Sequence, residues 1–343
     1  LLGDPDIIIF DEITAALSED RRRFFYNLVE DLKKLGKIVI FISHDLQEVL
    51  NISDNITVMK DGEVVTTKAS TALDEDSLKK LMVGREVKDI YYRSKIKTTP
   101  CAGKVAMEVK GLSYDGIFTD ISFTLFYGEI LGIAGLSGCG MHDLGKTIFG
   151  LIPGFEGEIY LPSKKARVKD IKSAITAGIS YVPKDRDDEG LMLRASVKDN
   201  ICLPSIDNLI KKIGFISPGE KKKLAKDIVN NFQIKTRDIE QNIYELSGGN
   251  KQKVSISSWM AKNNEILILD CPTRGVDIGV KAYIYQRIVE AREDGVAILL
   301  ISDELPELIG ISDRIIVMKN GRIEGIFNRE DGFSEDEIIE VMI

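Results

Sequence analysis

Glu129-Ile130-Leu131-Gly132-Ile133-Ala134, followed directly by Gly135-Leu136-Ser137-Gly138-Cys139-Gly140-Met141-His142, is the stretch that decides the fold. The first six residues, apolar after the initial acid, predict a buried β-strand, and the residues after the glycines predict a helix. Glycines allow consecutive backbone N–H groups to curl around phosphate oxygens, and the N-terminus of the following helix adds partial positive charge. We therefore expect residues 135–142 to bind the phosphates of a nucleotide.

Two residues of this loop depart from the P-loop pattern, in which a lysine for phosphate and a serine or threonine for magnesium follow the last glycine. Met141 and His142 stand at these positions. A second alignment places the same pattern at residues 140–147, where every fixed position matches. That alignment would put two glycines inside the strand and leave only residues 146–149 for the helix. We interpret it as a decoy and Lys146 as an exposed or packing helix residue.

A second motif is centred on Ser247. It consists of a serine-glycine-glycine turn, an apolar-periodic helix and a buried strand that ends at Asp270, 23 positions after the serine (270 − 247 = 23). A hydroxyl and successive N–H donors at a helix N-terminus suit the γ-phosphate of a nucleotide. Besides Asp270, the residues predicted to contact nucleotide here are Ser247, Gly248, Gly249, Asn250 and Gln252.

The chain also contains an internal repeat. Asp11, which ends an apolar run, corresponds to Asp270 at an offset of 259 positions (270 − 11 = 259). The same offset relates Ser53-Asp54 to Ser312-Asp313 and Val58-Met59-Lys60 to Val317-Met318-Lys319. An offset that stays constant over about fifty positions indicates a duplicated domain.

The repeat predicts how the chain is divided. We expect residues 1–84 to be the C-terminal part of a first nucleotide-binding domain whose upstream part lies before residue 1. Residues 105–343 then form a second, complete but degenerate domain. The polar segment 85–104 between them is the expected linker. In both copies strand, helix and strand alternate, which predicts an α/β fold with a parallel sheet and chemistry at the carboxyl ends of the strands.

An acidic pair ends the first copy's strand. Asp11 is placed to hold Mg²⁺, and the neighbouring Glu12 to polarise an attacking water. We therefore expect a metal ligand and a catalytic base at the end of this strand.

Together these motifs resemble the double-domain ATPases of ribose, galactose and xylose type importers, within the ABC superfamily. The most specific segments are Gly128-Glu129-Ile130-Leu131-Gly132-Ile133-Ala134-Gly135-Leu136, Pro272-Thr273-Arg274-Gly275-Val276-Asp277 and Ser312-Asp313-Arg314-Ile315-Ile316-Val317-Met318. The resemblance implies P-loop NTPase domains with a parallel-sheet core, an antiparallel β part and a helical subdomain. It also implies that His44 is the switch histidine that contacts the γ-phosphate, and that Ser247 begins the signature motif.

The resemblance further implies ATP and Mg²⁺ as cofactors. The implied partners are membrane permease subunits and, indirectly, a periplasmic or lipid-anchored sugar-binding protein, and the implied location is the cytoplasmic face of the cell membrane, peripherally bound. In this family each nucleotide site combines the Walker motifs of one domain with the signature of the other. The competent site is therefore expected to join the first copy's Walker B residues with the second copy's signature.

The second copy departs from the family at three further positions. Cys271 stands where a catalytic glutamate is usual, and Asp303 stands where the first copy has His44. A neutral thiol is a poor base, and Asp303 would bring negative charge towards an anionic phosphate. Lys184 replaces the acid of a Val-Pro-Glu-Asp-Arg segment, which in the family substitutes for an ordinary Gln loop and is expected to face the membrane subunit.

Composition and charge limit the classes of function that fit this sequence. A net charge of −8 gives no overall electrostatic attraction to nucleic acid, and the longest apolar runs are far shorter than a membrane span of about 20 residues. The four cysteines form no Cys-x-x-Cys pair, which fits a reducing cytoplasm. Three alternatives to a sugar-importer ATPase stay open: a non-hydrolysing ABC scaffold, a nucleoside-type importer ATPase, and an ABC protein that acts on ribosomes or DNA. The last would carry long basic or coiled-coil insertions, which the sequence lacks.

Overall fold

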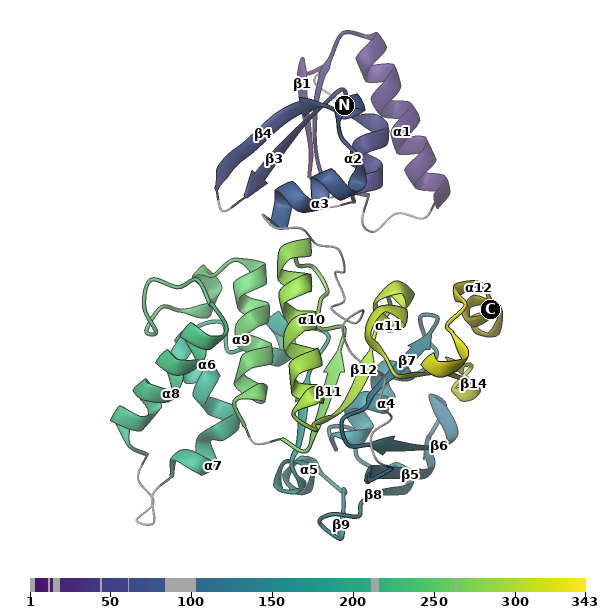
Figure 1. Ribbon diagram of the computed structural model, residues 1–343, viewed down its shortest axis with the longest axis vertical. Coiled ribbons are helices and arrows are strands. Elements are labelled where there is room, and N and C mark those ends of the chain that lie inside the picture. Colours follow the sequence, from purple (N-terminus) through teal and green to yellow (C-terminus); the bar gives the residue numbers. More distant parts are fainter. Residues whose placement is uncertain are drawn as a thin grey trace. The chain divides into compact units, whose positions relative to one another are not determined.

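The computed structural model describes residues 4–11, 13–14, 19–43, 45–60, 62–83, 103–210, 216–262 and 264–343. These residues form two compact units, each of which is considered by itself. Figure 1 shows the first in purple and blue and the second in teal to yellow.

The first unit pairs a short parallel sheet with an antiparallel hairpin. Strands β1 and β2 run parallel, with Ile7 opposite Ile38 and Ile9 opposite Ile40. These four isoleucines are 45–63% exposed, so one face of the two-stranded sheet is apolar and uncovered. The elements in chain order are β1 (Ile7–Asp11), α1 (Glu19–Lys34), β2 (Ile38–Ile42), α2 (Leu46–Ile52), β3 (Asn55–Lys60), β4 (Glu63–Ala69) and α3 (Glu75–Val83).

A six-stranded sheet forms the centre of the second unit. Its order is β10-β11-β12-β7-β13-β14, and all neighbours are parallel except the last pair. β7, β11 and β12 are buried at every position, which explains their nearly continuous apolar sequences. The strands are β7 (Ile130–Gly135), β10 (Ile179–Val182), β11 (Ile266–Asp270), β12 (Ala297–Ile301), β13 (Arg314–Lys319) and β14 (Arg322–Asn328).

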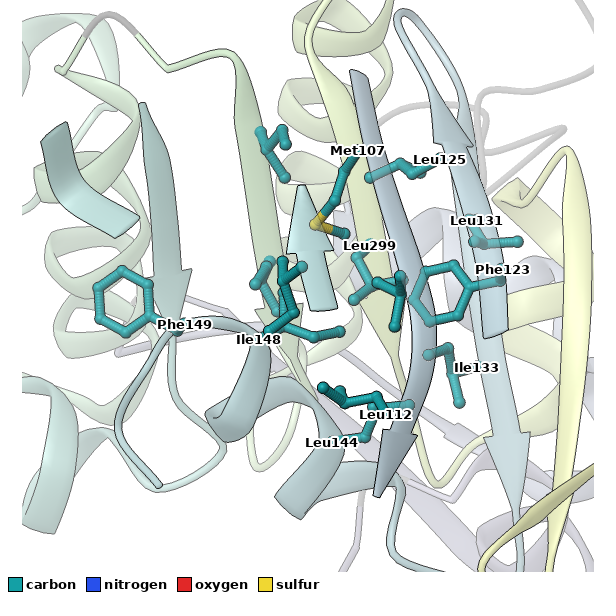
Figure 2. Close-up of a cluster of buried hydrophobic side chains, with 14 of the residues drawn as sticks. Met107, Leu112, Phe123, Leu125, Leu131, Ile133, Leu144, Ile148, Phe149 and Leu299 are labelled. Atoms are coloured by element: carbon teal, nitrogen blue, oxygen red, sulfur yellow. The ribbon is translucent and has the colours of Figure 1, made fainter. Parts of the chain in front are cut away.

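A four-stranded antiparallel sheet packs against this centre. Figure 2 shows Met107 and Phe123 of this sheet close to Leu131 of β7 and Leu299 of β12, in one apolar cluster with Leu144 of the following helix. Burial of such side chains is the main stabilising contribution to the domain. The sheet has the order β6-β5-β8-β9 and consists of β5 (Val105–Tyr114), β6 (Phe118–Phe126), β8 (Glu156–Leu161) and β9 (Ala166–Arg167).

Helices complete the second unit, and four of them form a subdomain with its own small apolar clusters. The subdomain helices are α6 (Val197–Cys202), α7 (Ile206–Leu209), α8 (Pro218–Asn231) and α9 (Gly248–Met260). The others are α4 (Met141–Ile148), α5 (Ile171–Ala177), α10 (Ile278–Glu293), α11 (Leu305–Ile311) and α12 (Glu335–Met342). Parallel sheet, antiparallel sheet and helical subdomain together confirm the predicted fold class.

Residues that correspond to each other in the repeat make equivalent contacts inside each unit. Glu48 accepts a hydrogen bond from Thr14 at 2.7 Å, and Glu307 accepts one from Thr273 at 2.9 Å. Both glutamates are buried. Glu48 also accepts a hydrogen bond from Ser43, which follows β2, and Glu307 accepts one from Ser302, which follows β12. Both hairpins have a β-bulge at the equivalent Val-Met step. A duplicated sequence has therefore kept a duplicated buried polar network.

Candidate functional site

The glycine-rich loop has the strand-loop-helix context that the sequence predicts. β7 ends at Gly135, one residue later than expected, and α4 begins at Met141. Gly138 and Gly140 have φ of +85° and +90°, a conformation that other residues rarely adopt. The first backbone N–H groups of α4 have no partner within the helix, so they are directed towards the space where an anion would bind.

The alternative alignment at residues 140–147 is a decoy, as predicted. Gly145 is buried in the middle of α4, and a Cβ there would lie 2.5 Å from the Ile301 side chain, so this glycine allows close packing of helix on sheet. Lys146 donates a hydrogen bond to Glu189 at 2.6 Å. Neither residue belongs to a loop that could surround phosphate.

Met141 occupies the place of the usual phosphate-binding lysine and carries no charge. Its side chain is 1% exposed and belongs to the apolar core cluster of the second unit. Leu136, Ser137 and Gly138 in the same loop are exposed, whereas Cys139 is buried against the loop's first glycine. The loop therefore offers backbone donors and no cation from its own lysine position.

His142 joins the ends of two neighbouring strands. Its Nδ1 lies 2.7 Å from Asp270 Oδ1 at the end of β11, and its Nε2 lies 3.1 Å from Asp303 Oδ1 just after β12. Tyr181 donates to the other Asp270 oxygen at 3.2 Å. Asp270 is fully buried, so both of its carboxylate oxygens are used by protein side chains.

Lys184 completes this polar cluster, and the sequence did not predict its position. Its Nζ lies 2.7 Å from Asp303 Oδ2 and 2.9 Å from His142 Nε2. The segment that was expected to face a membrane subunit therefore directs its lysine towards the phosphate loop. Two departures from the family pattern could have indicated this position: Lys184 replaces an acid, and Met141 replaces the lysine of the loop.

The protonation of the cluster follows from these contacts. Burial and the nearby charge of Lys184 favour the neutral ring of His142, but its hydrogen bonds to Asp270 and Asp303 outweigh both and raise its pKa from 6.5 to about 9. The hydrogen bond from His142 lowers the pKa of Asp303, and the bond from Lys184 adds to the effect. Burial and the charge of Asp270 raise the pKa of the Cys271 thiol, so this residue is a neutral thiol at pH 7.

Magnesium does not fit this cluster. Mg²⁺ prefers oxygen ligands in octahedral geometry, and a phosphate loop usually supplies a hydroxyl for it. Here the hydroxyl position holds His142, whose ring already binds the Asp270 carboxylate that would otherwise face the metal. Among the described residues, the glycine-rich loop of the second unit therefore lies beside a polar cluster that offers no fitting magnesium site.

The signature segment is a helix N-terminus. Ser247 is the exposed N-cap of α9, and its Oγ accepts a hydrogen bond from Asn250 Nδ2 at 2.9 Å. Asn250 also accepts from the backbone N–H of Lys235 at 2.8 Å. The amide of Asn250 thus fixes the serine, while Gly248 and Gly249 begin the helix with free first-turn donors.

Gln252 has a structural contact that the sequence did not predict. It is buried, and its Nε2 donates to the backbone carbonyl of Pro272 at 2.7 Å. Arg186 donates to the Gln252 side chain at 3.3 Å and to the carbonyl of Arg274 at 2.8 Å. Gln252 therefore contacts the segment after Cys271, and its contact with nucleotide stays a prediction.

Of the site residues predicted in the first unit, one lies within the described residues. Asp11 is exposed at the end of β1, paired in register with Ile42 of β2. Glu12 and His44 lie outside the described residues, so their roles stay predictions from the repeat.

The His142 contacts predict a pH-dependent stability. Because the folded-state pKa of about 9 lies above the unfolded value of 6.5, the stabilisation is complete below pH 6.5 and is lost as pH rises through 9. We expect the free energy of unfolding to fall by about 1–3 kcal/mol more in the wild type than in His142→Gln between pH 6 and pH 10. The free energy of unfolding is measured by urea denaturation at each pH, with the fluorescence of Trp259 as the signal. Parallel losses in both proteins would contradict the assignment.

Comparisons with known proteins agree with this geometry. The ABC transporter family profile matches residues 118–274. The chain is 41% identical over 335 residues to the ribose import ATP-binding protein of Bacillus licheniformis, covering 98% of this chain and 67% of that protein. It is 39% identical over 329 residues to a putative ribose/galactose/methyl galactoside import ATP-binding protein of Geobacillus kaustophilus, covering 96% of this chain and 64% of that one. The chain thus spans about two thirds of the length of these relatives.

Solved structures show the same fold. A nucleotide-free ATP-binding cassette of an ABC transporter superimposes with a TM-score of 0.56 at 20% identity, covering 70% of this chain and 99% of that chain. A dimeric cassette bound to ADP and Pi gives a TM-score of 0.56 at 23% identity, covering 65% of this chain and 98% of that chain.

Proposed function

Since this chain belongs to the ABC transporter ATP-binding proteins, in the group that includes the ribose import ATP-binding proteins, we propose that it is the energy-coupling ATPase subunit of a bacterial monosaccharide importer. The observation that carries the proposal is 41% identity sustained over 335 residues, across both units. Both the acidic strand end of the first copy and the signature of the second lie within this span. We assign residues 1–84 to the first nucleotide-binding domain and residues 105–343 to the second.

The working site in this proposal is composite. Asp11 would hold Mg²⁺, which neutralises charge on the phosphates of bound ATP. Glu12 accepts the proton of the attacking water, and His44 contacts the γ-phosphate. The N–H groups at the start of α9 and the exposed Ser247 hydroxyl close the site from the other domain.

The second domain's own phosphate loop contributes no turnover in this scheme. Cys271, at the position of the base, is a buried thiol whose pKa is raised, so it is neutral and cannot take the proton of water. Asp303 holds His142 and Lys184 instead of contacting a γ-phosphate. These two features favour a regulatory or structural role for the second site. The non-hydrolysing scaffold would then apply to the second domain and not to the whole protein.

Transport requires further subunits. None of the described helices is long and apolar enough to span a bilayer. In the proposed system, permease subunits form the path for the sugar, and a periplasmic or lipid-anchored binding protein delivers it. The ATPase binds peripherally at the cytoplasmic face of the cell membrane, and nucleic acid is not a partner.

Reconstitution tests the proposal. The complete protein is assembled with its permease in vesicles and supplied with its sugar-binding protein, and phosphate release is measured with ribose, galactose, xylose or a nucleoside. We expect one monosaccharide to raise ATP turnover severalfold and to accumulate inside. Turnover stimulated by a nucleoside alone would overturn the sugar assignment, and vesicles with no turnover under any condition would overturn the ATPase assignment.

A further inference from the structure

We propose that the phosphate loop at residues 135–142 binds nucleotide without a divalent cation, because His142 and Lys184 supply the positive charge that magnesium and a loop lysine supply elsewhere. The inference rests on the proposed function in one respect, that this loop faces a nucleotide. It goes further by naming the two residues that carry the charge and by excluding the metal.

The loop carries no cation at its own lysine position. A nucleoside triphosphate carries several negative charges, and backbone N–H groups contribute only partial charges to balance them. Met141 stands at the lysine position. Its uncharged side chain is buried in the apolar core, so it offers no positive charge to a phosphate. Positive charge at this site must therefore come from another element.

Lys184 is that cation. It follows β10, the edge strand beside β11, and its Nζ lies 2.9 Å from His142 Nε2 and 2.7 Å from Asp303 Oδ2. The side chain is partly exposed, which leaves its ammonium accessible from the solvent side. A lysine on a flexible stem binds phosphate as a point charge, as the usual loop lysine does.

His142 takes the place of the metal. A magnesium ion would neutralise the buried carboxylate of Asp270 and bridge it to the phosphates. The imidazole already lies 2.7 Å from this carboxylate, and its second nitrogen points to Asp303 at 3.1 Å. The imidazole thus lies between the two carboxylates and meets the buried one with a nitrogen group that Mg²⁺ does not readily use as a ligand.

Asp303 then acts as the stand-in for phosphate. Its carboxylate accepts from both cations and is itself exposed at the rim of the cluster. An incoming phosphate presents the same chemistry, oxygen acceptors with negative charge, and competes for the same two donors. Nucleotide binding is therefore expected to displace Asp303, and removal of its charge is expected to strengthen binding.

A transition metal is the competing occupant. The ligand atoms of His142, Cys271 and Asp303 lie within 4.8 Å of one another, a donor set that suits Zn²⁺. The Lys184 ammonium, however, already lies 2.9 Å from His142 Nε2 and 2.7 Å from Asp303 Oδ2, so it occupies the space in which these ligands would hold a metal. The arrangement favours an anion over a metal.

Binding of trinitrophenyl-ATP to the purified 343-residue chain tests the inference. Residues 1–84 contain no glycine-rich loop, and the Lys184 and Asp303 variants identify the part of the fluorescence signal that comes from residues 135–142. We expect the affinity in EDTA to lie within about threefold of that in Mg²⁺, Lys184→Met to weaken it about tenfold or more, and Asp303→Asn to strengthen it. Lys146→Ala is the matched control, a lysine of α4 that bonds Glu189, and it should leave binding unchanged.

The outcomes separate this inference from the proposed function. Binding that requires Mg²⁺, or weaker binding by Asp303→Asn in a variant with a normal unfolding transition, overturns the metal-free site and leaves the ATPase assignment untouched. Stabilisation by Zn²⁺ that is lost in Cys271→Ser also overturns it. Absence of binding in both buffers overturns it as well, and the turnover of the reconstituted transporter then decides the proposed function independently.

Discussion

Replacement of Glu12 by Gln is expected to lower the ATP turnover of the assembled importer about a hundredfold or more, whereas Cys271→Ser leaves turnover nearly unchanged. A glutamine keeps the size of the side chain but cannot accept a proton from the attacking water. The Cys271 thiol is buried and its pKa is raised, so its loss removes no base. Phosphate release by the full protein reconstituted with its permease measures both effects.

The comparison between the two variants gives the decisive result, because both residues follow the aspartate of their own strand end. Glu12→Gln should still bind ATP, which separates a chemical defect from a folding defect. Similar losses from both substitutions would contradict two unequal sites, and a large loss from Cys271→Ser alone would reverse the assignment.

Ser247→Arg is expected to reduce turnover about a hundredfold while ATP still binds to the first domain. Ser247 is exposed at the N-cap of α9, so an arginine fits the folded domain without displacing core atoms. In the composite site that we propose, however, its bulk would occupy the space of the γ-phosphate contact. Nucleotide affinity and phosphate release, measured on the reconstituted protein, separate binding from closure.

A neighbouring substitution provides the control for Ser247. Lys251, on the next turn of α9, bonds Asp187 at 3.3 Å, so Lys251→Arg changes the same helix and keeps the charge. It should leave turnover close to wild type. Near-normal turnover in Ser247→Arg would refute the assignment of this helix end to a nucleotide held by the other domain.

The sequence predicted those features of the fold that depend on local pattern. Buried strands such as β7 and β11 have nearly continuous apolar sequences. Gly138 and Gly140, after β7, supply the positive φ values that the loop needs. The constant offset between the copies predicted the duplicated domain. It did not predict the shared network of Glu48 and Glu307, because buried polar partners leave no periodic signal.

The site was predicted less completely, since its contacts join residues far apart in the chain. From the sequence, Asp303 was expected to bring unbalanced negative charge to a phosphate. Parallel neighbours β7, β11 and β12 instead bring His142, Asp270 and Asp303 to one edge of the sheet, where the charges offset one another. Lys184 was identified as a departure from the family pattern. The position of its side chain, however, depends on the path of the backbone after β10, which the sequence did not predict.

The isoleucine face of β1 and β2 has a consequence for handling the molecule in the laboratory. Ile7, Ile9, Ile38 and Ile40 present adjacent apolar side chains on a sheet of only two strands. Such a surface lowers colloidal stability, because water is released whenever two copies meet through it. Preparations of this chain should therefore scatter more light as concentration rises, and solubilising tags or mild detergent should keep it monodisperse.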